Sequence, residues 1–438
     1  YRSHRLLDTH MLFIKFFTIL LLTPFFILAV NKIRLGYLNA LYIVYPFFYI
    51  FYVIPLILDI AIGVPDQYSY IGFHMFEWSK NDTYTTVIYS FMLIIVTAIL
   101  FMFGIKNKVP IEALHSDINS FWAKYAQNVF KTVFLILFFY PTYLVLVSFS
   151  RYGINPSYLF DYPFLARFYR PSLDFLFYYY MSFISILSFV GFLFLSKRKS
   201  IWNLLIFSFP LFISFSINGK RAIVAYLIFL VCFMIYIKKE VSPKKMVVLM
   251  GLVAFLGIFL SILYQSIIRK QEFSAMSPSE YMGMRVDFGR DDVLSMAIYS
   301  SVYGDSIIPH DGISVIYFAR FLYGGLVNMG LVTPYKYSVY ATSYLMGYSY
   351  PQDLGWGMTT GLWDELVSNF GIIFGTFVFC IYFCFVMRIA DRYKNQYFTL
   401  LTYMFCILSL ALQFSSFAII VALWGLFFAI LTMKKLKI

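Results

Sequence analysis

The sequence has few charged residues and very few cysteines. Of 438 residues, 13% are charged, 61% are hydrophobic and four are cysteine, and the mean hydropathy is +0.77. A soluble domain carries about 25% charged residues, so this chain could not cover a globular surface with polar groups. The four cysteines lie within apolar runs, which excludes a disulfide scaffold. The composition also excludes a disordered chain and a cytosolic enzyme, and it predicts a chain embedded in the lipid bilayer.

Several motifs are also missing. The sequence has no Walker lysine motif, no Ser/His/Asp triad pattern and, in the predicted external loops, no Asp-x-Asp of the kind used by glycosyltransferases. The histidines have no spacing typical of zinc ligands. We therefore do not expect an ATP-driven pump, a metal site or a cofactor, and any chemistry would draw on an activated membrane substrate.

The formal net charge of +13 does not indicate nucleic acid as a partner. The basic residues separate apolar runs instead of clustering on one segment, which is the pattern of membrane topology.

The apolar runs predict an all-α polytopic membrane protein. Each candidate span holds about 17–25 mainly apolar residues, the length needed to cross a bilayer. We count eleven of them, at residues 10–30, 38–63, 83–105, 126–150, 173–195, 201–217, 221–238, 246–268, 362–388, 397–413 and 417–433.

Short positive loops favour the cytoplasmic side, so we assign that side to the loop holding Lys197-Arg198-Lys199. Alternation then places the Lys-rich C-terminus inside. Eleven spans would leave the N-terminus outside, although Arg2, Arg5 and Lys15 lie there. Either the first span is miscounted or the true start is missing, and we favour twelve spans in the full gene product, with no cleavable signal peptide.

The predicted organisation has three parts. Residues 1–268 form an N-terminal bundle of spans, residues 269–361 form one large external loop, and residues 362–438 form the C-terminal spans. Loops this long are usually functional or small domains of their own. Helical spacing predicts short amphipathic helices from Asp291 to Val302 and from Ile316 to Leu322, which could lie against the outer membrane surface.

Basic residues gather at the outer ends of the predicted spans. Arginine suits a diphosphate, because guanidinium offers bidentate donors and keeps its charge when partly desolvated. The alternative is that these residues are interfacial anchors. The candidate diphosphate-binding residues are Arg221, Arg285, Arg290, Lys220 and Arg320.

The acidic candidates lie at predicted helix starts. Asp291 and Asp292 could cap their helix, which we favour, or pair with the neighbouring arginines, bind a metal or supply a general base. Glu365 follows Asp364 in the first turn of a span, where the helix dipole explains both, although they also point to the external site. His310 lies in a turn and could accept a proton from a sugar hydroxyl or be merely solvated.

Two short stretches resemble the Wzy-type polymerases of bacterial surface polysaccharide (O-antigen or capsule), which are related to the O-antigen ligases. The first is the turn Asn218-Gly219-Lys220-Arg221-Ala222, which opens a span. The second is Trp363-Asp364-Glu365-Leu366 with Asn369-Phe370-Gly371, where the large loop re-enters the membrane. The number of spans and the late external loop add to the resemblance.

The resemblance implies a metal-independent, inverting glycosyl transfer on the outer face of the bacterial cytoplasmic membrane. Undecaprenyl-diphosphate-linked oligosaccharides would be donor and acceptor, and a chain-length regulator protein would be a partner. Arg221 falls on the family's basic turn, while Arg285 and Arg290 fall in its large loop. The catalytic candidates are His310, Asp291 and Glu365, although the ligase pattern of histidine followed eight residues later by glycine is not met, because residue 318 is Phe318.

Two rival functions remain open. A lipid-linked oligosaccharide flippase or another carrier predicts charges in mid-span and internal repeats around a central cavity. Here Asp59 and Lys131 lie towards span ends and we find no convincing repeat, which favours an enzyme. An O-antigen ligase would use the same chemistry with a different acceptor, and the sequence does not separate it from a polymerase.

Overall fold

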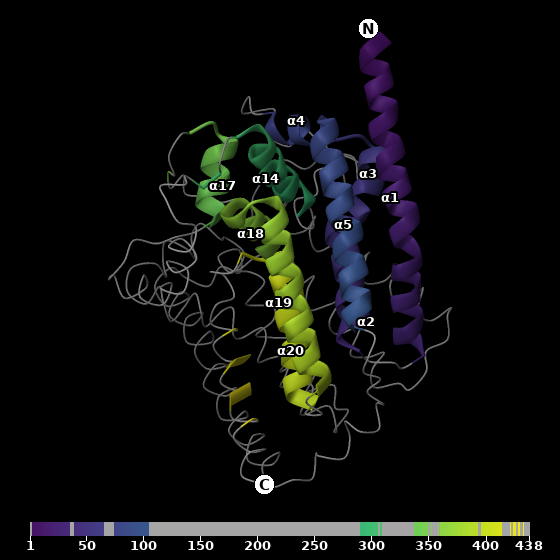
Figure 1. Ribbon diagram of the computed structural model, residues 1–438, viewed down its shortest axis with the longest axis vertical. Helices are drawn as coiled ribbons and strands as arrows, with labels where there is room; N and C mark the ends of the chain where they lie inside the picture. Colours follow the sequence, from purple (N-terminus) through teal and green to yellow (C-terminus); the bar gives the residue numbers. More distant parts are fainter. Residues whose placement is uncertain are drawn as a thin grey trace, which may run out of the picture. The chain divides into compact units, whose positions relative to one another are not determined.

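The computed structural model groups residues 1–110 and 277–438 into one compact unit and residues 111–276 into another. All residues that the structure describes belong to the first unit (Figure 1). They are residues 2–35, 39–64, 74–104, 290–304, 307–308, 337–348, 352, 358, 360–392, 396–413, 421, 424–425, 428–429 and 432. The predicted boundaries at 269 and 361 stay predictions.

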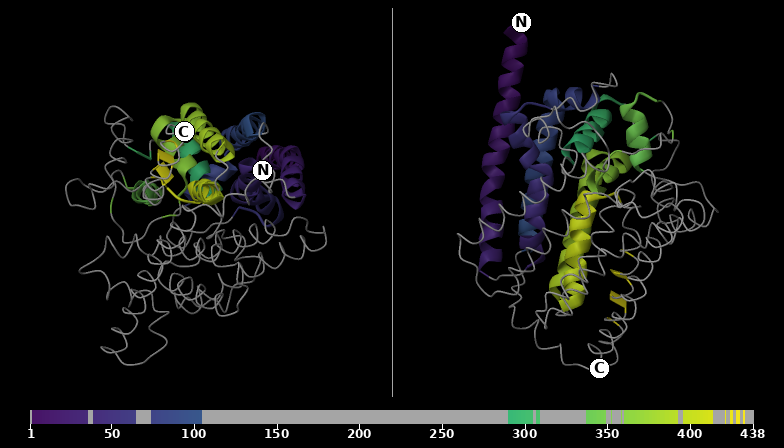
Figure 2. Two further views of the ribbon diagram at one scale, coloured as in Figure 1. Left: turned by 90° about the horizontal axis from the view of Figure 1, so that it is seen from below. Right: turned by 180° about the vertical axis from the view of Figure 1, so that it is seen from behind.

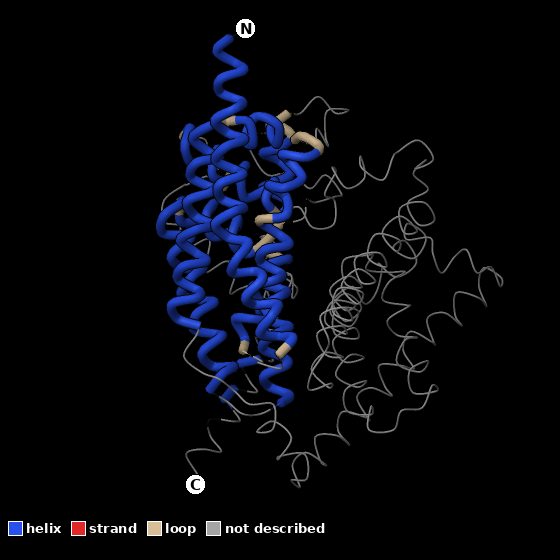
Figure 3. The backbone as a smooth tube through the Cα atoms, turned by 90° about the vertical axis from the view of Figure 1, so that its right-hand side faces the viewer, coloured by secondary structure: helices blue, strands red, loops and turns tan. Residues whose placement is uncertain are grey.

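Every regular element among these residues is a helix (Figure 3). The helices are α1 (Arg2–Arg34), α2 (Ala40–Tyr52), α3 (Ile54–Ala61), α4 (Met75–Asn81), α5 (Thr83–Gly104), α14 (Asp291–Tyr303), α17 (Tyr337–Leu345), α18 (Leu362–Phe370), α19 (Ile372–Arg392) and α20 (Gln396–Ala411).

Four helical stretches are long and apolar enough to cross a bilayer: His10–Arg34, Ala40–Ala61, Thr83–Gly104 and Ile372–Arg392. The first three coincide with the predicted spans at 10–30, 38–63 and 83–105. The second combines α2 and α3, which meet at Val53. Pro55, in the first turn of α3, has no N–H to donate and so favours a break there.

The predicted span at 362–388 is wrong in one respect, because two helices replace a single one. α18 ends at Phe370, and Gly371 adopts a φ of +77°, a left-handed conformation that glycine reaches without the steric cost of a side chain. α19 then starts at Ile372. The predicted span at 397–413 corresponds to α20.

The remaining predicted spans lie outside the described residues or are described at only a few positions. The first group comprises 126–150, 173–195, 201–217, 221–238 and 246–268, and the second is 417–433.

The long helices pack around α2. α1 contacts α2, α3 and α5, while α19 contacts α2, α5 and α20 (Figure 2). Trp363 of α18 is fully buried, and its ring lies 4.9 Å from that of Phe379 and 5.8 Å from that of Phe48, between centroids. Its indole Nε1 donates to Thr376 Oγ1 at 3.2 Å, so the polar atom is satisfied inside the apolar core.

The short helices gather at one end of this group, at the top of Figure 1. α14 packs against α4, α5 and α18, and every side chain from Asp291 to Ile298 is buried. The prediction of a helix with acids in its first turn is confirmed. The prediction that it lies on a surface as an amphipathic helix is wrong, because its whole first two turns are enclosed by neighbouring helices.

The opposite end of the group carries basic residues. Asn39 Nδ2 donates to the carbonyl of Gly104 at 2.8 Å, and the guanidinium of Arg388 lies 5.3 Å from the centre of the Phe103 ring. These contacts bring together the start of α2 and the last turns of α5 and α19. Lys32 and Arg34 are in the last turn of α1, next to the start of α2, and Arg392 is in that of α19.

Candidate functional site

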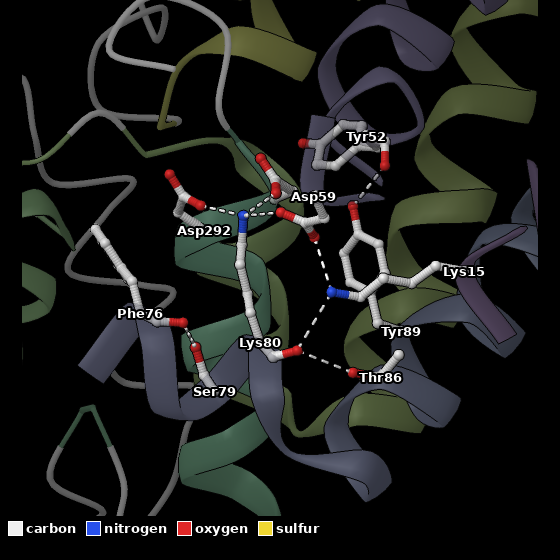
Figure 4. A network of polar contacts seen from close by, with 10 residues as sticks. Lys15, Tyr52, Asp59, Phe76, Ser79, Lys80, Thr86, Tyr89 and Asp292 are labelled. Atoms are coloured by element: carbon white, nitrogen blue, oxygen red, sulfur yellow. Dashed lines mark hydrogen bonds and ion pairs between the residues drawn. The ribbon is translucent and has the colours of Figure 1, made fainter. Parts of the chain in front are cut away.

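Lys80, in the last turn of α4, is surrounded by carboxylates. Its ammonium group forms ion pairs with Asp291 and Asp292 in the first turn of α14 and lies 3.9 Å from Asp59 Oδ1 of α3 (Figure 4). All four side chains are at most 5% exposed. A cation at the end of one helix and two anions at the start of another also match the helix dipoles.

Lys15 of α1 extends this group. Its Nζ donates to Asp59 Oδ2 at 3.0 Å and to the carbonyl oxygen of Lys80 at 3.4 Å. The same carbonyl accepts a hydrogen bond from Thr86 of α5. Segments far apart in the sequence are thus joined through charged groups, and we call Lys15, Asp59, Lys80, Asp291 and Asp292 the ion network.

Arg290 immediately precedes α14 and is 1% exposed. Its Nε donates to the carbonyl oxygen of Ala411 at 2.8 Å, and its guanidinium carbon lies 5.6 Å from the centre of the Phe51 ring. Ala411 is the last residue of α20, where carbonyls lack partners within the helix. Arg290 therefore caps α20, with a positive charge at the favourable end of the helix dipole.

Asp364 stabilises the start of α18. Both of its carboxylate oxygens accept the N–H of Gly361, at 2.8 and 3.0 Å. Nearby, Tyr52 Oη donates to the carbonyl of Leu410 at 3.2 Å. A Cβ added to Gly361 would lie 2.8 Å from Asp364 Oδ1 and 3.1 Å from Tyr52 Oη, so the two side chains meet at this glycine.

Burial raises the pKa of Asp364 well above its ordinary value, and the negative charge of Glu365 adds to this effect. The N–H of Gly361 and the positive charge of Arg290 act in the opposite direction. Since Asp364 is completely buried, the desolvation of its carboxylate outweighs both. Arg290 thus lies close enough to act on the first turn of α18.

Among the residues that the structure describes, every buried charged side chain belongs to the ion network or to the group of Arg290, Asp364 and Glu365. Three are cations, Lys15, Lys80 and Arg290, and five are acids, Asp59, Asp291, Asp292, Asp364 and Glu365. Burying charges is expensive even when they are paired. The gathering of all of them at one end of an apolar helix group is the feature that marks this region as a candidate functional site.

Three of the predicted site residues are in this region. Asp291 contacts Lys80, and Glu365 is 4% exposed next to Asp364, on which Arg290 acts. The favoured interpretation of Asp291 and Asp292 is right in placing both acids in the first turn of α14, where they favour the helix dipole, but neither is the cap, since Arg290 occupies that position and no side-chain cap is formed there. Both carboxylates pair with Lys80, and their predicted pairing with the neighbouring arginines stays a prediction, since Arg285 lies outside the described residues. The other candidates lie outside the described residues: Arg221, Lys220, Arg285, Arg320 and His310.

Sequence reasoning missed Lys15, Asp59 and Lys80 as members of the site. A signal was present, since Lys15 and Asp59 are isolated charges within apolar runs. Such residues are costly in a bilayer and usually face a partner inside the protein. Lys80 instead resembled an ordinary loop lysine, and only the fold shows that it is enclosed.

The raised pKa of Asp364 predicts a pH effect on stability. A carboxyl group that is harder to ionise when folded stabilises the protein fully below its unfolded pKa, near the ordinary value of 3.8, and less as the pH rises through the folded pKa. We expect Asp364→Asn, which keeps an oxygen for the Gly361 N–H, to gain stability relative to the parent chain as the pH increases. Melting temperatures of both proteins in detergent at several pH values test this. A constant difference between them would contradict it.

Comparisons with known proteins give no match: no protein-family model, no curated protein and no solved structure matches the chain.

Proposed function

We propose that this chain is a multi-pass protein of the bacterial cytoplasmic membrane that polymerises undecaprenyl-diphosphate-linked oligosaccharide repeat units on the outer face. The observation that carries the proposal is the position of the buried charges. Three residues of the predicted external loop and of the segment where it re-enters the membrane lie together at one end of a group of apolar helices. They are Arg290, Asp291 and Glu365.

The outer surfaces of the long helices support a location in the bilayer. Contiguous exposed apolar patches on soluble proteins are normally small. Here large apolar side chains are exposed along whole helices: Leu12, Phe13, Phe16, Phe17, Leu20, Leu21, Ile27 and Leu28 on α1, Val87, Phe91, Met102 and Phe103 on α5, and Ile373, Phe374, Phe377, Ile381 and Phe385 on α19.

The charges at the two ends support the orientation. Lys32, Arg34, Arg388 and Arg392 lie at the end opposite the candidate site, and short positive segments favour the cytoplasm, although Arg2 and Arg5 begin α1 at the other end. The candidate site at the other end would then face the outside, where a lipid-linked repeat unit is exposed after its transfer across the membrane.

The proposed reaction needs no external energy source. An acceptor sugar hydroxyl attacks the anomeric carbon of the donor, the bond from that carbon to the diphosphate oxygen breaks, and undecaprenyl diphosphate leaves with the electron pair. The hydroxyl proton passes to a base, for which Asp291, Glu365 and His310 are candidates. Arg221, Arg285, Arg290, Lys220 and Arg320 are the candidates to stabilise the leaving diphosphate.

The distribution of charge favours an enzyme over a flippase. A carrier would place ionisable groups near the middle of its spans. Lys15 and Asp59 do lie within spans, but both are close to the end where the loop residues gather. An O-antigen ligase would fit the same site and would differ only in its acceptor.

Deletion of the gene in its host separates these functions. A polymerase predicts that surface glycan shrinks to one repeat unit and that single repeat units accumulate on undecaprenyl diphosphate at the outer face. Gel analysis of the glycan and extraction of the lipid-linked intermediates measure both. Long polymer left on the lipid would indicate a ligase, and intermediates trapped on the cytoplasmic face would indicate a flippase. Either result would overturn the proposal.

A further inference from the structure

A cluster of tyrosine rings lies on the surface at the same end as the ion network. Tyr84 at the start of α5 is 70% exposed, and Tyr303 at the end of α14 is 52% exposed. The Tyr303 ring lies 4.5 Å from that of Tyr299, between centroids, at an angle of 44°. Tyr84 is two residues after Asp82, whose carboxylate accepts the Tyr303 hydroxyl, and α14 packs on α5, so the three phenols lie in one neighbourhood.

A carboxylate fixes this cluster. Tyr303 Oη donates to Asp82 Oδ1 at 2.7 Å, while Asp82 Oδ2 accepts from the Thr85 N–H at 2.8 Å and from its hydroxyl at 2.7 Å. The hydrogen bond to Asp82 raises the pKa of Tyr303 to about 12, because the carboxylate accepts the phenolic proton and disfavours its loss. The hydrogen bond to Asp82 and the contact with Tyr299 therefore restrain the half-exposed Tyr303 ring.

The charges near the tyrosine cluster determine which kind of ligand could bind there. In residues 74–84 and 290–304 the two cations, Lys80 and Arg290, are buried at 4% and 1% exposure. The partly exposed charged groups of these segments are the acids Glu77 and Asp82. A phosphate or an anionic lipid head group would be repelled here. A neutral sugar would not, since its C–H faces stack on the electron-rich faces of aromatic rings and its hydroxyls donate to carboxylates and phenols.

We propose that Asp82, Tyr84, Tyr299 and Tyr303 form a saccharide-binding subsite that holds sugars of the repeat unit away from the reacting bond. The proposal rests on the proposed function and deepens it. Tyr303 is twelve residues after Asp291 on one helix, which places the two about 18 Å apart along its axis. That separation corresponds to a short oligosaccharide extending from the reacting bond to the subsite.

The test measures binding and needs no turnover. The probe is the repeat-unit oligosaccharide of the host, released from its lipid by mild acid, and the protein is the full chain in detergent, studied by isothermal titration calorimetry. Loss of one stacking ring should weaken binding about tenfold, so Tyr84→Ala and Tyr303→Ala should each raise Kd by that factor. Tyr303→Phe keeps the ring and should have a smaller effect.

Phe91→Ala is the matched control. Phe91 is 62% exposed and lies two turns after Tyr84 on the same helix face, inside the apolar stretch. Its loss should leave Kd unchanged. The subsite is overturned if the parent chain does not bind the oligosaccharide, if Phe91→Ala weakens binding as much as the tyrosine variants, or if those variants alter only retention of anionic phospholipid.

The outcomes for the subsite and for the polymerase are distinguishable. Single-unit glycan in the deletion strain together with unchanged Kd values in the tyrosine variants would overturn the subsite alone. The expected Kd changes together with normal glycan length in the deletion strain would overturn the polymerase alone.

Discussion

Replacing Lys80 with methionine should destabilise the protein by about 3–5 kcal/mol, the usual cost of removing one partner from a buried ion pair. The variant leaves Asp59, Asp291 and Asp292 enclosed without the ammonium group that each of them approaches. Lys15 pairs with Asp59 and donates to the carbonyl oxygen of Lys80. We expect a large fall in melting temperature in detergent and less folded protein on size-exclusion chromatography.

Two further variants test whether the loss of stability in Lys80→Met comes from the ion network. Arg392→Met removes an exposed cation at the opposite end of α19 and should change stability by less than about 0.5 kcal/mol. Adding Asp292→Asn to Lys80→Met removes one of the uncompensated charges and should recover part of the loss, since residues of one network do not act additively. A Lys80→Met protein as stable as the parent would contradict the ion network.

Gly375→Ala should also be strongly destabilising, by about 3 kcal/mol, because overpacking against rigid atoms forces the backbone to move. Its Cβ would collide with the carbonyl oxygen of Leu366 and would lie 2.7 Å from the Leu366 carbonyl carbon and 2.8 Å from Val367 Cα. All three atoms belong to the main chain of α18, so no side-chain rotation could relieve the contact. The close packing of α18 on α19, which positions Asp364 and Glu365, would be lost.

Gly425→Ala is the control for this variant. A Cβ there meets nothing within 4 Å, and alanine has the higher helix propensity. The control should therefore be neutral or slightly more stable in the same melting experiment. If Gly375→Ala behaved like Gly425→Ala, the close approach of α18 and α19 would be contradicted.

The sequence predicted most of the long helices correctly because hydrophobic length is a local property. To predict the spans at 10–30, 38–63 and 83–105, it was enough to find long apolar stretches that end at polar residues. The break at Gly371 was missed, since apolar residues continue on both sides and a left-handed glycine leaves no trace in hydropathy. α4 and α17 were also missed, because a helix of 7 or 9 residues offers few repeats of the helical period.

The candidate site was only partly predictable, for a different reason. Clustering of charge around residues 285–292 identified Arg290 and Asp291, but the pairing of Asp291 with Lys80 joins residues 211 positions apart. Contacts of this kind depend on tertiary packing, which one sequence does not reveal. The same holds for Arg290, which was predicted to bind a diphosphate because it lies among clustered charges and whose Nε in the structure donates to the end of α20.

Reconstitution tests the central claim most directly. The purified full chain would be placed in liposomes with undecaprenyl-diphosphate-linked repeat units from its host, and the glycan length would be followed on gels. The account predicts products longer than one repeat unit, with release of undecaprenyl diphosphate and without added nucleotide. Repeat units that stay single, while the reconstituted protein keeps its melting transition, would contradict it.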